Sequence, residues 1–165
     1  MKKPQAALII GVLLAKANWP EIESILTGKF GKIALKTEPI DFIFTNYYND
    51  EMGDDIKRFW IAFEKKIFED ELADIKNYTI FLETKYGRSG KRTINLDPGY
   101  LNLSRLILAS TKDFSHRIYL KDGIYGEVTL IYKNKGFTSL PWTYPDYKIP
   151  LLQEFLKKIR KSILL

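Results

Sequence analysis

The chain has 165 residues, a length that fits one domain over residues 1–165, and its 45% hydrophobic content excludes a largely disordered chain. A formal charge of +6 favours anionic partners such as phosphates, nucleic acid or a lipid surface. The absence of cysteine excludes disulfides and thiol catalysis, and the single histidine, His116, excludes a site built from several histidines.

The N-terminal segment allows two interpretations. Residues 6–14 form an apolar run after two lysines, and Ala15 and Ala17 flank Lys16 in the small-x-small pattern of a cleaved export signal. The run is too short to span a bilayer. Continuous apolar residues are also typical of a central strand that is covered on both faces, and we favour this interpretation. With that strand retained in the domain, we expect a cytoplasmic protein without a membrane span.

Helices and strands then alternate along the chain. Asn18 is a suitable N-cap for a helix that ends near Gly28 or Gly31. Alternating apolar residues predict strands over residues 40–44 and 59–63, with a long polar loop between them.

A second helix and a fourth strand complete this part of the chain. An acidic first turn at residues 69–71, followed by apolar residues at helical spacing, predicts a helix that ends at Gly87. Residues 91–96 are interpreted as a strand.

The order β-α-β-β-α-β over residues 6–96 is that of a ferredoxin-like core. This is an α+β fold in which two helices pack on one face of a four-stranded antiparallel sheet, with the first strand in a central position. Residues 97–165 are interpreted as an extension of this core, because no flexible linker and no repeat separates them.

The extension contains a predicted hairpin. Residues 115–120 and 124–132 form its strands, joined by a three-residue loop that ends at Gly123. This register places Arg117 opposite Glu127 as a cross-strand ion pair.

The rest of the extension is less uniform. Residues 101–107 fit either a short helix or a strand. Two prolines stiffen the aromatic segment 141–147, which should form an ordered loop. From Pro150 onward, apolar residues follow one helical stripe with cations on the opposite side, which predicts a C-terminal helix.

Three stretches carry a family resemblance: residues 95–100 (NLDPGY), 111–120 (TKDFSHRIYL) and 141–147 (PWTYPDY). They resemble an uncharacterised prokaryotic family, the domain of unknown function 4416, and the resemblance covers essentially the whole chain. It implies that the N-terminal apolar run belongs to the domain. It implies little about activity, since some members of that family carry only the label of a GTP-binding protein.

The residues support that label poorly. No G-x-x-x-x-G-K-[ST] phosphate cradle is present, and the glycines of residues 28–32 are too close together and lie at a helix end. Residues 111–113 resemble the guanine-reading Asn/Thr-Lys-x-Asp pattern only loosely, because the Asp comes one place early. We therefore expect no GTP hydrolysis of the P-loop kind.

Two residues are candidates for catalysis. His116 carries an imidazole, the side chain most often used as a general acid or base, although it also suits packing at the rim of an apolar face. Asp97 could present a carboxylate to a cation or a sugar hydroxyl, although Asp-Pro-Gly is also ordinary turn chemistry. The acidic residues 50–55 lack the spacing of a Ca²⁺ loop, so we expect no metal site there.

Four further residues are candidates for ligand binding. Lys112 has no partner evident from the sequence, and it is a better phosphate ligand than Arg117, which we expect in an ion pair. Asn95 could add polar contacts, and Tyr100 and Trp142 could form the walls.

Our leading hypothesis is that a small phosphorylated or nucleotide-like ligand binds in a cleft between the core and the extension. Catalysis, any cofactor and the oligomeric state stay open. One alternative is an RNA-binding module, because residues 57–63 faintly resemble the third strand of an RRM without its glycine. Another is a non-enzymatic protein-interaction domain.

Overall fold

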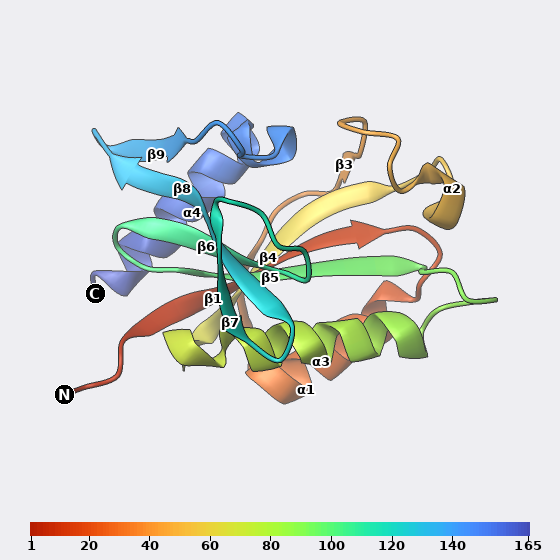
Figure 1. The fold of residues 1–165 in the computed structure, drawn as a ribbon, viewed down its shortest axis with the longest axis horizontal. Coiled ribbons are helices and arrows are strands. Elements are labelled where there is room, and N and C mark those ends of the chain that lie inside the picture. The colour runs from red at the N-terminus through yellow and green to blue at the C-terminus, as the bar shows by residue number, and fades with distance from the viewer.

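One antiparallel sheet of nine strands organises the fold, and the computed structural model describes all of residues 1–165 (Figure 1). The elements in chain order are β1 (Gln5–Leu14), α1 (Trp19–Phe30), β2 (Ile33–Lys36), β3 (Ile40–Asp41), α2 (Asn49–Met52), β4 (Lys57–Phe68), the 3₁₀ turn η1 (Glu69–Glu71), α3 (Leu72–Lys85), β5 (Ile94–Leu101), β6 (Arg105–Ser110), β7 (Arg117–Lys121), β8 (Ile124–Lys133), β9 (Gly136–Ser139), the 3₁₀ turn η2 (Pro145–Lys148) and α4 (Pro150–Ile163). The strands lie in the order β2-β4-β1-β5-β6-β8-β7, while β3 pairs with β4 and β9 pairs with β8. The predicted α+β class is confirmed.

Strand β1 is buried on both faces, because its alternate residues face two different layers of helices. Ile10 packs in a cluster with Leu26 of α1 and Leu82 of α3. Ile9 faces the other way and belongs to a cluster with Phe155 of α4. Figure 1 shows α1 and α3 together on one side of the sheet and α4 on the other. The prediction that the apolar run forms a central strand is confirmed.

Helix α1 has the ends that the sequence predicts. The side chain of Asn18 accepts a hydrogen bond from the Glu21 backbone N–H at 3.5 Å. After Phe30 the chain leaves the helix at Gly31, whose φ of 94° favours glycine. Because Gly28 lies inside this helix, residues 28–32 do not form a phosphate-binding loop.

The second strand lies elsewhere than the sequence predicts. A strand was expected over residues 40–44, but β2 is the strand that pairs at length with β4, and β3 is only two residues long. Phe42 instead packs beside Met52 in a small cluster under the following loop, with the ring of Phe44 5.7 Å away. The alternation of these aromatics reflects burial in a loop rather than strand pairing.

Strand β5 starts later and runs further than predicted. It continues through Asp97, Pro98 and Gly99, so these residues form no turn. Pro98 pairs opposite Ile10 of β1, and pairing with β6 begins only at Gly99. A Cβ atom on Gly99 would collide with the Ile107 carbonyl oxygen, so glycine is needed for β6 to approach this closely.

The sheet does not end at β5: the four strands expected over residues 6–96 belong to a larger antiparallel sheet of nine strands. Residues 105–110, which overlap the end of the stretch that fitted either a helix or a strand, form β6, and β8 and β7 extend the same sheet. The C-terminal helix is confirmed as α4. No helix of this fold has both the length and the apolarity that a bilayer crossing needs.

The hairpin of β7 and β8 keeps the predicted pairing of Arg117 with Glu127, but its loop is shorter. Asp122 and Gly123 have φ angles of 49° and 78°, as in a two-residue turn with positive φ at both positions. A β-bulge around Leu120 takes up the extra residue and so preserves the expected register further along.

Candidate functional site

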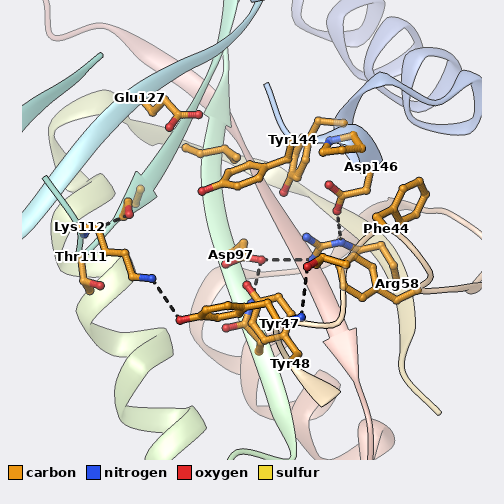
Figure 2. A pocket seen from close by; sticks show the side chains of 18 of the residues that line it. Phe44, Tyr47, Tyr48, Arg58, Asp97, Thr111, Lys112, Glu127, Tyr144 and Asp146 are labelled. Carbon is orange, nitrogen blue, oxygen red and sulfur yellow. Dashed lines mark hydrogen bonds and ion pairs between the residues drawn. The ribbon is translucent and has the colours of Figure 1, made fainter. Parts of the chain in front are cut away.

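A cavity of about 540 Å³ lies between the first and last parts of the chain (Figure 2). Strands β4 and β5 and helix α3 supply charged side chains, and residues 42–48 supply aromatic ones. The end of β6, the β7–β8 hairpin and the segment at η2 complete the lining. A cavity of this size suits a small-molecule ligand.

Arg58 of β4 is a buried cation in the lining of the cavity. Its Nε donates to Asp146 Oδ2 at 2.8 Å and one terminal nitrogen donates to Asp97 Oδ2 at 3.2 Å. Although burial lowers the pKa of Arg58, Tyr147 and the two carboxylates raise it above its ordinary value. The guanidinium therefore stays charged, and its pairing compensates for the loss of water.

Asp97 presents a carboxylate to the cavity from β5. Asn95, two residues earlier on the same face, donates to Asp97 Oδ2 at 2.8 Å, and Arg92 donates to Asn95 Oδ1 at 2.7 Å. Burial raises the pKa of Asp97, but the charges of Arg58 and Lys76 outweigh burial and hold it below its usual range. The carboxylate is therefore ionised at neutral pH.

Five cations line the cavity, and they differ in whether their charge is compensated. They are Arg58, Lys76, Arg92, Lys112 and Arg117. Four of them have a carboxylate oxygen within 4.0 Å, and Lys112 does not. The Lys112 Nζ donates instead to the hydroxyl of Tyr47 at 3.2 Å, an uncharged partner. Lys112 is thus the lining cation that is free to meet an anion.

Aromatic rings form two opposing walls of the cavity. Figure 2 shows Tyr47 and Tyr48 on one side of Asp97 and Tyr144 on the other. Tyr47 and Tyr48 contact edge to face with centroids 5.0 Å apart, and Arg117 donates to the Tyr144 hydroxyl at 3.0 Å. Burial raises the pKa of Tyr48, so its hydroxyl stays neutral. Such walls can stack against a flat ring.

Gly11 of β1 leaves the space that the buried side chains behind the cavity occupy. A Cβ atom at this position would lie 2.7 Å from the Tyr147 hydroxyl, 3.1 Å from Trp60 Nε1 and 3.2 Å from Arg58. The Tyr147 hydroxyl and Trp60 Nε1 are buried without a hydrogen-bond partner. Tyr147 lines the cavity, but its hydroxyl is buried beside Gly11.

The structure brings three of the six predicted site residues to this cavity. Asn95, Asp97 and Lys112 line it. Tyr100 is not in the lining and instead packs half-buried between the hydrophobic clusters on the α3 side of the sheet. Trp142 is not in the lining either, and its indole N–H donates to the Val128 carbonyl at 2.8 Å.

His116 lies behind the cavity rather than in it. Its ring is stacked between Phe114 and Trp142, with centroids 5.7 Å and 4.8 Å away. Its Nε2 is 3.2 Å from Glu127 Oε2, the same oxygen that accepts from Arg117 Nε at 2.8 Å. His116 does not line the cavity, and it contacts the lining residue Glu127.

Several lining residues escaped the sequence reasoning. Arg58 entered the sequence analysis only as part of the apolar stretch 57–63. A cation in a buried strand needs carboxylate partners nearby, and this requirement could have identified Arg58 as a site residue. Glu51 does not line the cavity, but it pairs at 2.8 Å with the lining residue Arg92, a contact that the spacing of the acidic residues 50–55 did not predict. Tyr48 gave no sequence signal beyond its aromatic character.

The arrangement of possible metal ligands and three comparisons with known proteins complete the description of this site. No group of three or more His, Cys, Asp or Glu side chains is arranged to hold a metal ion. A family model described as "Domain of unknown function (DUF4416)" matches residues 4–163. No curated protein and no solved structure matches the chain.

Proposed function

The chain belongs to the DUF4416 family, whose description assigns no activity, and we propose from the cavity itself that the protein binds a small phosphorylated or nucleotide-like ligand. The ligand lies between strands β4 and β5 of the predicted core and the segments around Lys112 and Tyr144 in the extension. Binding is the function proposed, and it does not require a catalytic step.

The uncompensated ammonium of Lys112 carries this proposal. Each of the other four lining cations has a carboxylate oxygen within 4.0 Å, so its charge is already compensated within the protein. An anionic ligand group at Lys112 would add the attraction of two opposite charges, which the present hydrogen bond to an uncharged tyrosine hydroxyl lacks.

The tyrosines support a flat or ring-containing ligand. Tyr47 and Tyr144 lie on opposite sides of the cavity, and both are substantially exposed. Stacking on such rings tolerates different bases or sugars, so the walls suit a nucleotide-like ligand without selecting one.

The proposal also covers the fold of the unit that carries the cavity and the location of the protein. We propose that β1, α1, β2, β4, α3 and β5 make a ferredoxin-like unit, supported by the strand order β2-β4-β1-β5 and by two helices on one face. We also propose a cytoplasmic location, because the apolar run that imitates an export signal is the buried strand β1.

The RNA-binding alternative receives less support. It needs aromatic side chains displayed on the sheet, whereas Phe59 and Trp60 of β4 are 2% and 0% exposed and pack into opposite helix layers. An anionic small molecule therefore suits the exposed groups of this chain better than a stacked single strand.

The test begins with a search for co-purifying small molecules and RNA by mass spectrometry and absorbance. Purified protein is then titrated with the ribonucleoside monophosphates and with ribose phosphate by calorimetry. Lys112→Ala should weaken binding of a phosphorylated probe about ten- to hundredfold, with little effect on folding. Lys158→Ala is the matched control, because Lys158 is exposed on α4 without an ion pair.

Two results would contradict the proposal. One is that no phosphorylated probe binds up to millimolar concentration. The other is that Lys112→Ala and Lys158→Ala bind the probe as tightly as the unmodified protein does.

A further inference from the structure

We propose that Asp97 accepts a hydrogen bond from a hydroxyl group of the ligand, so that the site selects phosphate esters of a sugar or other polyol. This inference rests on the proposed function, and it names the ligand class of the same cavity.

Asp97 is the carboxylate of this cavity that a ligand can reach. Three carboxylates line the cavity, and the side chains of Asp146 and Glu127 are only 5% and 2% exposed. The side chain of Asp97 is 24% exposed. A ligand group that donates a hydrogen bond to a carboxylate in this cavity would therefore contact Asp97.

The two oxygens of Asp97 differ in their use. Oδ2 accepts from Asn95 at 2.8 Å and from Arg58 at 3.2 Å. Oδ1 accepts no hydrogen bond within the protein, and its nearest cation, the ammonium of Lys76, is 3.8 Å away. Because Oδ2 is fixed from two sides, Oδ1 has a defined direction and a lone pair available to a donor.

The charges around Asp97 favour a neutral donor. A ligand ammonium at Oδ1 would face the cations of Arg58 and Lys76, which already compensate this carboxylate. A ligand anion at the same place would be repelled by Asp97 itself. A hydroxyl group donates one hydrogen bond without adding a charge, so it avoids both penalties.

The other end of the cavity calls for the opposite chemistry. There the ammonium of Lys112 has no carboxylate partner. The neighbouring residue, Thr111, also lines the cavity and carries a hydroxyl group. Figure 2 shows Lys112 to one side of Asp97, with the hydroxyl of Tyr47 pointing toward Lys112. A ligand that satisfies both ends has an anionic group at one end and hydroxyl groups at the other, as sugar phosphates and nucleotides do.

The first experiment uses the unmodified protein with paired probes. Each ribonucleoside monophosphate is compared by calorimetry with its dideoxy counterpart, which lacks both ring hydroxyls. The ribonucleotide should bind at least about tenfold more tightly, because a hydrogen bond to a charged acceptor is lost with the dideoxy probe.

Two variants assign this difference to a residue. Asp97→Ala should reduce the ratio of the two affinities to within about twofold, because the acceptor is removed. Lys112→Ala should weaken both probes alike and preserve the ratio. If Asp97→Ala does not fold, the comparison of the two probes on the unmodified protein decides alone.

The outcomes separate this inference from the proposed function. Equal affinity of ribo and dideoxy probes for the unmodified protein would overturn the role of Asp97 and leave phosphate binding at Lys112 intact. A ratio that survives Asp97→Ala would do the same. Failure of every probe to bind would overturn both proposals.

Discussion

Arg58 of β4 and Asp146 of η2 form a buried ion pair that joins positions 88 residues apart, with Nε 2.8 Å from Oδ2. Both side chains are 5% exposed. The pair fixes the segment that includes Tyr144 against the central strands, and it places Arg58 where it can also hold Asp97. The stability of the fold and the shape of the cavity therefore depend on the same contact.

Asp146→Asn should destabilise the protein by about 3 kcal/mol, because removing one charge of a buried pair leaves the other poorly compensated. Urea denaturation followed by circular dichroism measures this free energy of unfolding. Asp113→Asn is the control, because Asp113 is exposed and has no ion pair. Equal stability of the two variants would show that the buried pair contributes nothing.

Gly11→Ala should destabilise the protein by roughly 1–3 kcal/mol, because the new methyl group would meet Tyr147, Trp60 and Arg58 at 2.7–3.2 Å. It should also weaken ligand binding, since these side chains lie at the back of the cavity. Gly28→Ala is the control, because a Cβ there meets nothing within 4 Å, and alanine should stabilise α1 by up to about 1 kcal/mol. Thermal unfolding should move in opposite directions for the two variants.

Glu83 should make the stability depend on pH. Burial raises the pKa of Glu83 from 4.5 to about 7. The charge of Lys76 and the Leu96 N–H, which donates to Glu83 at 2.6 Å, lower this pKa but do not outweigh burial. Between pH 4.5 and 7, Glu83 is protonated in the folded protein and ionised in the unfolded chain. Its contribution to stability is therefore fully present below pH 4.5 and is lost as the pH rises through 7.

Glu83→Gln removes this titration. Relative to the unmodified protein, the variant should gain up to roughly 3 kcal/mol between pH 5 and pH 8. Denaturation at several pH values measures the gain, and Glu38→Gln, an exposed site without an ion pair, should show none. A difference between Glu83→Gln and the unmodified protein that stays constant with pH would refute the assignment.

His116→Gln and His116→Phe separate packing from a role in binding. Gln removes the ring stacked between Phe114 and Trp142 and should cost about 1 kcal/mol, whereas Phe keeps a stacked ring. Both variants should bind a phosphorylated probe within about twofold of the unmodified protein, because His116 does not line the cavity. A loss of affinity in both variants would place His116 in the binding site after all.

The sequence by itself determined the elements whose signals are local. The apolar run of β1, the Asn18 cap of α1 and the stripe of α4 are properties of neighbouring residues, so their periods and caps could be read without a fold. The pairing of Arg117 with Glu127 belongs to the same class, because a short hairpin sets its own register.

Only the tertiary structure decided how the sheet is assembled and which polar residues meet. The strand expected at residues 40–44 and the turn expected at Asp97 failed because pairing and close approach of distant strands overrode local propensity. Arg58 meets Asp97 and Asp146 across 39 and 88 residues, distances over which no sequence period operates. Whether Lys112 has a carboxylate partner depends on every segment that folds around it, so the feature that supports the proposed function exists only in the folded chain.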